Sequence, residues 1–325
     1  EDVHHFAWSA DPDFMYEGGQ HHDIAIHVLY LRSDEEWDSA RVVGRAARAL
    51  SWLEGTLGEY AYPQLTILHR LDAGGTEFPM LVMNGGSSQG LITHEVTHQY
   101  AHAILANNEW RDAWLDEGLT SFLASWFFED HGEDGGWPRT MEFAASWPSG
   151  VQAQPVATPS ADFVSFQTYA LMSYTKASIV FRMLREYLGD DTFRQALRTY
   201  YARHKLSHVD ERDLRRAAED VSGEDLGWFF EQWFHTSATL DYGLGDIVIE
   251  EAGEGWVTRV EVFRAGDAWM PVTLEVGGEL RHLDSQERLQ RLEVVTRARP
   301  SVVEIDPERN LLDSDLSNNR RKLSP

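Results

Sequence analysis

The 325-residue sequence contains no cysteine. Disulfide bridges and thiolate metal sites are therefore excluded, and any transition metal must be held by histidine and carboxylate side chains. The sequence also has no apolar run long enough to cross a bilayer and no leading signal-peptide pattern. We therefore expect no membrane-spanning segment.

Lysine is scarce, because Lys176, Lys205 and Lys322 are the only three among 28 basic residues, which leaves 25 arginines. With 53 acidic residues the formal net charge is -25. Such a charge repels polyanions, which argues against nucleic acids and anionic membranes as partners. An acidic, lysine-poor surface suits high ionic strength, but a coding bias toward arginine explains the same composition, and both explanations stay open.

The sequence predicts an α+β protein with two domains and is long enough to bury a large core. Its hydrophobic content of 42% and charged content of 25% are those of a soluble globular protein. The pattern indicates strands at 22–31, 64–71 and 78–83 and a helix at 38–57, then helices from 166 to 234 with a stop at Gly189. Alternating β-branched runs follow at 246–250, 256–263, 270–276, 290–295 and 301–305, which is typical of a small β-sandwich.

One apolar segment carries the pattern His94-Glu95-x-x-His98. A helix turns by about 100° per residue, so the two histidines lie on one face, one turn apart, where both can bind one zinc ion. Glu95 points to the side of this pair and can act as a general base on a water bound there. An ordinary helix with surface histidines is the alternative, but the apolar flanks make this helix buried, where unpaired His and Glu are costly.

The third ligand is expected to be Glu117, nineteen residues after His98. Asn107 can end the first helix and Asp112 can begin a second, so that an antiparallel pair returns Glu117 to the two histidines. His102 continues the four-residue spacing, but one more turn moves it about 6 Å along the axis. No glycine stands before His102 to turn the chain back, so we expect it to be packed or solvated.

The segments HEVTHQY and WLDEGLTSF resemble the zinc signature of the M1 family of metallo-aminopeptidases, gluzincins with a thermolysin-like catalytic domain. Residues 74–79 are similar to that family's exopeptidase motif, and residues 169–177 are similar to its Tyr-x-Lys-Gly segment. Residues 3–14 resemble the junction between its N-terminal β domain and its catalytic domain. The resemblance covers roughly residues 1 to 305.

The resemblance implies one zinc ion per chain, with the roles assigned residue by residue. Zinc would be held by His94, His98 and Glu117, and Glu95 would be the general base. Tyr174 would donate a hydrogen bond to the oxyanion, although a packed core tyrosine is the alternative for this residue. Glu77 would bind the free α-amino group of a peptide, and the backbone of Gly74 and Gly75 would run along the substrate.

Four positions depart from the family pattern: Thr76 replaces Met, Phe78 replaces Asn, Asp116 replaces Asn and Ala177 replaces Gly. None of these changes removes a catalytic atom, but Thr76 and Phe78 bear on the shape of the substrate site. The expected function is therefore zinc-dependent removal of N-terminal residues from peptides. A zinc endopeptidase and a non-catalytic peptide-binding scaffold are the alternatives.

The expected organisation follows from the same resemblance. Residues 1–20 would be the remnant of a junction with a missing N-terminal β domain, and residues 21–239 would form the thermolysin-like domain, a small sheet plus a helical lobe. Residues 240–306 would form the β-sandwich, and the polar tail 307–325 would adhere to the surface or fray. The irregular stretch 130–162 would either line a cleft or form a mobile surface excursion. Both cytoplasmic and exported locations stay open, because the true N-terminus is expected to lie upstream.

Overall fold

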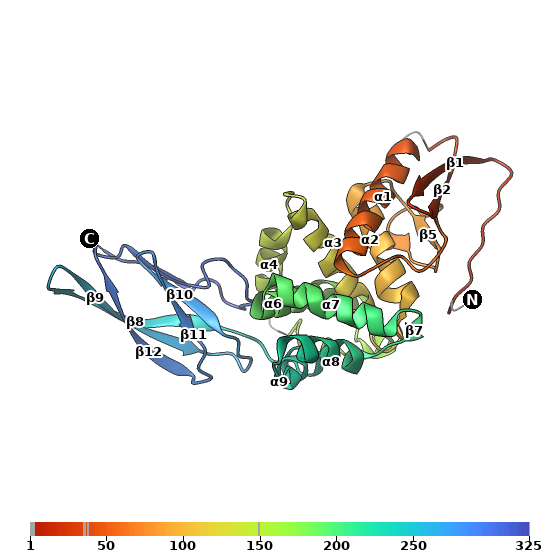
Figure 1. The fold of residues 1–325 in the computed structure, drawn as a ribbon. Helices are drawn as coiled ribbons and strands as arrows, with labels where there is room; N and C mark the ends of the chain where they lie inside the picture. The colour runs from red at the N-terminus through yellow and green to blue at the C-terminus, as the bar shows by residue number, and fades with distance from the viewer. Residues whose placement is uncertain (1–3, 35–36, 38, 149, 325) are drawn as a thin grey trace.

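The computed structural model describes residues 4–34, 37, 39–148 and 150–324. A helical body with a small sheet at its N-terminal end is joined to a β lobe that carries the C-terminus (Figure 1). The predicted α+β class is confirmed. Val3, the first residue of the junction-like segment, and Asp38, the first residue of the predicted helix 38–57, lie outside the described residues.

The N-terminal sheet has five strands in the order β1-β2-β3-β5-β4. Its strands are β1 (Phe14–His21), β2 (Ile24–Leu31), β3 (Gln64–His69), β4 (Gly75–Thr76) and β5 (Leu81–Asn84). β2, β3 and β5 are parallel, while β1 and β4 are antiparallel edge strands. The sequence-based boundary was wrong here, because residues 14–20, assigned to a junction, pair with β2 as part of this sheet.

Helix α1 (Ser39–Thr56) connects β2 to β3 and packs against the sheet. Helix α2 (Gln89–His98) follows β5 and begins at Ser88, whose side chain accepts a hydrogen bond from the Leu91 amide. The helix then widens into a π-helical segment, η1 (Gln99–Ile104). The short strand β6 (Leu105–Ala106) follows directly. Such wide turns are uncommon and occur often at functional sites.

Helical segments build the rest of the body. They are η2 (Trp114–Gly118), α3 (Leu119–Asp130), α4 (Trp137–Ala145), η3 (Ser160–Asp162), α5 (Phe166–Ala170), η4 (Leu171–Lys176), α6 (Ala177–Leu188), α7 (Asp190–His204), α8 (Glu211–Ser222), α9 (Gly227–Phe230) and η5 (Glu231–His235). Strand β7 (Ser207–His208) pairs with β6. α6 ends at Gly189 as the sequence predicted, with a backbone φ of 81° that suits glycine.

The stretch 130–162 is less irregular than expected, because it contains α4. Trp137, Met141 and Ala144 are buried on one face of this helix, at the spacing of successive helical turns. The remainder of the stretch carries Ser160, which lines a cavity described below. The prediction of an irregular connection was therefore wrong for residues 137–145, while the expected contribution to a cleft is confirmed at Ser160.

The C-terminal lobe contains two antiparallel sheets. One has the order β12-β9-β8 and the other β11-β10-β13-β14. The strands are β8 (Tyr242–Ala252), β9 (Gly255–Arg264), β10 (Val272–Val276), β11 (Glu279–Leu283), β12 (Leu289–Thr296), β13 (Val302–Ile305) and β14 (Arg320–Lys322). The tail beyond Pro307 does not fray, because Leu311, Leu312 and Asp313 are buried and β14 pairs with β13.

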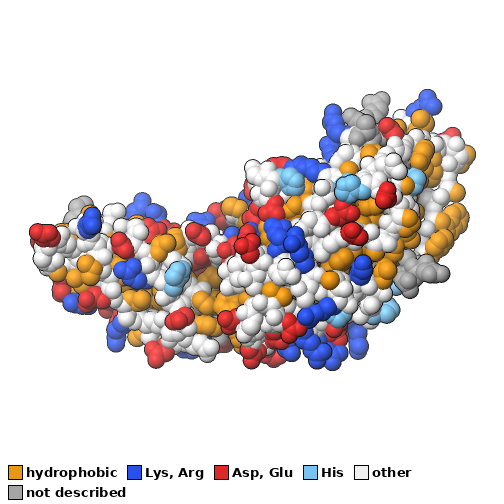
Figure 2. Space-filling model, viewed as in Figure 1, with side chains coloured by type: hydrophobic (Ala, Val, Ile, Leu, Met, Phe, Trp, Pro, Cys, Tyr) orange, Lys and Arg blue, Asp and Glu red, His pale blue; other side chains and the backbone are white. Residues whose placement is uncertain are grey.

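The two lobes share one continuous apolar core. At their junction the amide of Gln232 forms two hydrogen bonds with the backbone of Trp269, at 2.8 and 2.9 Å. Acidic side chains are spread over both lobes with basic ones between them, and no single acidic patch dominates the face in Figure 2. No helix in the described ranges is long and apolar enough to cross a bilayer.

Candidate active site

The side chains of His94, His98 and Glu117 converge on one point. The two histidine Nε2 atoms are 3.1 Å apart, and Glu117 Oε2 lies 3.4 Å from His94 Nε2 and 3.2 Å from His98 Nε2. Four ligands around a zinc ion at 2.0–2.2 Å are separated by about 3.3–3.6 Å when the geometry is tetrahedral. The triangle of donor atoms therefore fits zinc in size and in chemistry.

Asp116 sets the orientation of the His98 ring. Its Oδ1 lies 2.6 Å from His98 Nδ1, and both side chains are almost fully buried. Burial alone would raise the pKa of Asp116, but the adjacent His98 and His102 hold that pKa below its usual value. The carboxylate therefore accepts the Nδ1 proton of His98 and leaves the Nε2 lone pair facing Glu117 and His94, which is the ring state that a metal ligand requires.

Glu95 lies beside this triangle and is only 3% exposed. Burial raises its pKa to about 8, with His98 opposing the shift and Glu77 adding to it. Its Oε2 atom is buried without a hydrogen-bond partner among the described residues. A carboxylate with a pKa near neutrality and a free oxygen is suited to accepting and returning a proton.

Glycine at position 75 makes room for Glu95. A Cβ atom added to Gly75 would stand 2.0 Å from Glu95 Oε1. Gly75 belongs to the edge strand β4, and Gly74 before it has a φ of 71°. The two glycines thus bring the sheet edge directly against the Glu95 side chain.

Tyr174 also faces the triangle. Its hydroxyl donates a short hydrogen bond to Glu117 Oε1, and its ring lies parallel to that of His94, with centroids 6.4 Å apart. Burial and the nearby Glu117 raise the pKa of Tyr174, so the hydroxyl keeps its proton at neutral pH. Tyr174 is therefore a polar group at the site and not an enclosed core tyrosine.

Glu77 joins the same group from the loop after β4. A carboxylate oxygen of Glu77 lies within 4.8 Å of ligand atoms of Glu95 and His98, and burial raises its pKa. Glu77 also lines a cavity of about 520 Å³ that reaches Glu117. All eight residues proposed from sequence thus lie at or beside one site: His94, Glu95, His98, Glu117, Tyr174, Glu77, Gly74 and Gly75.

The cavity also contains residues that sequence reasoning missed. Its aromatic and carboxylate lining includes Glu109, Trp110, Phe163, Phe166 and Tyr169. Glu109 and Trp110 come from the connection between β6 and η2, and the others come from the segment around η3 and α5. The irregular composition of residues 130–162 indicated only the contribution of the neighbouring Ser160. Two smaller hollows, of about 310 and 340 Å³, border His94 and Tyr174 respectively.

Residues 82–233 match the sequence profile of the Peptidase family M1 domain. The region that holds the candidate site is therefore similar to a peptidase family M1 domain. The M1 match includes the triangle of His94, His98 and Glu117, together with Glu95 and Tyr174, but not Glu77, the two glycines or the β lobe.

Three comparisons agree with the M1 match. The chain is 28% identical to Aminopeptidase N of Lactococcus lactis over 153 residues, which are 44% of this chain and 18% of that protein. It is 29% identical to Tricorn protease-interacting factor F2 of Thermoplasma acidophilum over 250 residues, which are 68% and 31% of the two chains. The fold is similar to that of Legionella pneumophila aminopeptidase A, with a TM-score of 0.71, 16% identity and coverage of 90% and 37%. This chain spans less than a third of the length of these curated relatives.

Within the segment that matches the M1 profile, Gln99 connects the loop that carries Glu77 to the helix that carries His94 and His98. Its side-chain Oε1 accepts a hydrogen bond from the Met80 amide at 2.7 Å, and its Nε2 donates to the Phe78 carbonyl at 3.2 Å. Gln99 is fully buried and stands directly after His98, where the π-helical turn begins. The loop 77–80 and His98 are therefore held together through one side chain.

Proposed function

We propose that this protein is a zinc-dependent aminopeptidase, in which His94, His98 and Glu117 hold the zinc ion. The observation that carries the proposal is the position of Glu77. Its half-buried carboxylate lies within 4.8 Å of ligand atoms of Glu95 and His98, at the cavity that reaches Glu117. A metal-binding triangle alone fits many hydrolases, but a further half-buried carboxylate beside it fits a substrate that carries a positive charge next to the cleaved bond.

Zinc bound at the triangle would supply a Lewis acid that lowers the pKa of water and polarises the peptide carbonyl. Glu95 accepts the proton of the attacking water at its Oε2 atom, which has no hydrogen-bond partner among the described residues, and passes it to the departing amine. Tyr174 keeps its proton and turns its hydroxyl from Glu117 toward the oxygen that becomes negatively charged.

Glu77 binds the free α-amino group of the substrate. A buried ammonium group needs a carboxylate partner, and Glu109 adds a second negative charge on the same cavity wall. Trp110, Phe163 and Phe166 give this cavity an apolar side suited to the first side chain of the peptide. The backbone of Gly74 and Gly75 runs beside the substrate, and the hollows at His94 and Tyr174 accommodate the remainder of the peptide.

One assay distinguishes the proposed aminopeptidase from the two alternative functions. A zinc endopeptidase would not require a free amine, and a non-catalytic scaffold would bind peptides without cleaving them. The measurement compares aminoacyl p-nitroanilides with their N-acetylated forms, after zinc loading and after treatment with a chelator. We expect hydrolysis only with the free amine and only with zinc. Equal cleavage of both forms would favour the endopeptidase, and no cleavage by the zinc-loaded protein would favour the scaffold.

A variant tests the role of Glu77 directly. Glu77→Gln keeps the size of the side chain but removes its charge, so kcat/KM for free-amine substrates should fall by about 30-fold or more, as for a buried ion pair left unpaired. Glu133→Gln, which changes an exposed carboxylate, serves as the matched control. An unchanged kcat/KM in Glu77→Gln would remove Glu77 from the amine site.

A further inference from the structure

A second group of histidines lies on the opposite side of Asp116 from the triangle. The two oxygens of Asp116 hold two successive histidines: Oδ1 lies 2.6 Å from His98 Nδ1, and Oδ2 lies 3.3 Å from His102 Nδ1. His102 Nε2 is then 3.3 Å from Glu109 Oε2, much as His98 Nε2 is 3.2 Å from Glu117 Oε2. The pairing of Asp, His and Glu at the triangle is thus repeated around His102.

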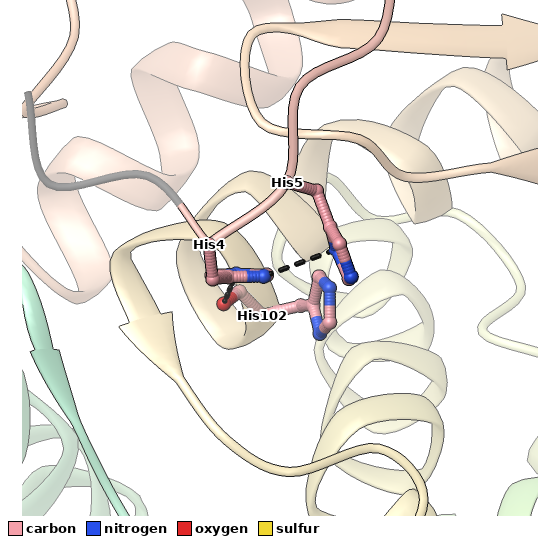
Figure 3. Close-up of side chains that lie close together, drawn as sticks. All are labelled: His4, His5 and His102. Carbon is pink, nitrogen blue, oxygen red and sulfur yellow. Dashed lines mark hydrogen bonds between the residues drawn. The ribbon is translucent and has the colours of Figure 1, made fainter.

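His4 and His5 of the N-terminal segment complete this group. Their rings lie against the ring of His102, with centroid distances of 4.6 and 5.9 Å (Figure 3). His4 Nε2 lies 3.0 Å from the His102 carbonyl oxygen, which only accepts hydrogen bonds, so His4 carries its proton on Nε2. The lone pair of His4 is therefore on Nδ1, which faces His5 Nδ1 at 3.1 Å.

This tautomer is the one that a metal-binding histidine adopts. Histidine ligands usually donate their other ring N–H to a backbone carbonyl or a carboxylate, and here His4 donates to a carbonyl and His102 to Asp116. One ring nitrogen from each of His4, His5 and His102 lies within 4.8 Å of the others. Tetrahedral ligands need separations of about 3.3 Å, so the required contraction is at most about 1.5 Å. His5 is exposed and its ring is free to make that movement.

We propose that His4, His5 and His102 form a second binding site for a divalent transition-metal ion such as zinc, with Glu109 as the adjoining carboxylate. Imidazole nitrogen is a donor that zinc, copper and nickel prefer, and a three-histidine set leaves a fourth position for water or Glu109. The ion would fasten residues 4–13, which have no regular secondary structure, to η1. The site shares none of its three histidines with the triangle, although Asp116 and Glu109 border both.

Metal stoichiometry tests the site. The protein is stripped with a chelator, dialysed against a zinc buffer and analysed for bound metal. The double variant His4→Ala/His5→Ala should bind one zinc equivalent fewer than the unchanged protein, as should His94→Ala, which removes a ligand from the triangle. His282→Ala, a histidine variant in the β lobe, is the matched control and should bind the full amount. Equal zinc in the double variant and the unchanged protein would overturn the proposal.

Hydrogen exchange gives a readout that does not depend on catalysis. In the His94→Ala background, zinc should slow exchange of the backbone amides of residues 4–13, because the ion joins this segment to His102. The same addition should have no effect after His4→Ala/His5→Ala is introduced. If zinc does not change the exchange rate of these amides in the His94→Ala protein, the proposed site is contradicted. It is also contradicted if zinc still slows exchange after His4 and His5 are replaced.

Discussion

Lys176 allows a quantitative test of how much a buried charge lowers the free energy of unfolding of this protein. The residue lies in η4, two positions after Tyr174, and its side chain is fully buried. Its Nζ atom has no hydrogen-bond partner among the described residues. Burial lowers its pKa from 10.5 to about 8.

The pKa shift sets both the size and the sign of the effect on stability. The difference between 10.5 and about 8 corresponds to roughly 3 kcal/mol. Between those two pH values the unfolded chain binds a proton that the folded chain has released, so the free energy of unfolding rises with pH across this window. Below about pH 8 both states bind the proton, and the fold bears the whole unfavourable contribution of the buried ammonium group.

Lys176→Met should therefore stabilise the protein, because methionine has a similar length and no charge. We expect the free energy of unfolding to rise by roughly 3 kcal/mol at pH 7, and the gain to shrink toward zero as the pH approaches 10.5. Urea unfolding of both proteins at several pH values measures this difference, and Lys205→Met, at an exposed lysine, is the control. A less stable variant, or a gain that does not change with pH, would refute the reasoning and show that the amine has a partner.

Four further predictions concern the proposed active site. Glu95→Gln should retain zinc but lower kcat by about 10²–10⁴-fold, since an amide cannot accept the proton of water; loss of zinc from this variant would contradict that role. Tyr174→Phe should lower kcat by about 10²–10³-fold with little change in KM, and unchanged turnover would assign oxyanion binding to another group. Asp116→Asn should weaken zinc binding by about 10–100-fold in a competition titration with a chromogenic chelator, and unchanged affinity would mean that His98 keeps its orientation unaided. Gly75→Ala places a Cβ 2.0 Å from Glu95 Oε1, so kcat should fall by about 10²-fold while zinc is retained; full activity would show that Glu95 has another productive position.

The sequence predicted the parts of the site whose geometry is local. Two histidines four residues apart on one helix must lie on one face, and the triangle built on His94 and His98 follows from that spacing. Gly189 ended α6 as expected, because its positive φ is a local property of the chain. The helix α4 was missed although Trp137, Met141 and Ala144 carry the helical period, because Gly and Pro residues around them were given more weight.

The remaining features depend on contacts between distant segments. Glu109 lines the cavity because the connection between β6 and η2 brings it near Glu77 and Asp116, which no short-range pattern encodes. His4 lies 98 residues before His102, and their contact needs the N-terminal segment to pass over η1. The π-helical turn after His98 is another case, since its wider spacing is stabilised by the Gln99 side chain bonding to the loop 77–80.

The connection through Gln99 also fixes the spacing between the proposed amine site and the proposed metal site. The carboxylate that would hold the start of a peptide and the helix that would hold the metal belong to different segments, yet the hydrogen bonds of Gln99 fix the distance between them. One extended residue spans about 3.3–3.6 Å, so a rigid separation admits one count of residues between the amine and the cleaved bond. Without the hydrogen bonds of Gln99, the number of residues between the bound amine and the cleaved bond would vary. Dipeptides would then be released as well as single amino acids.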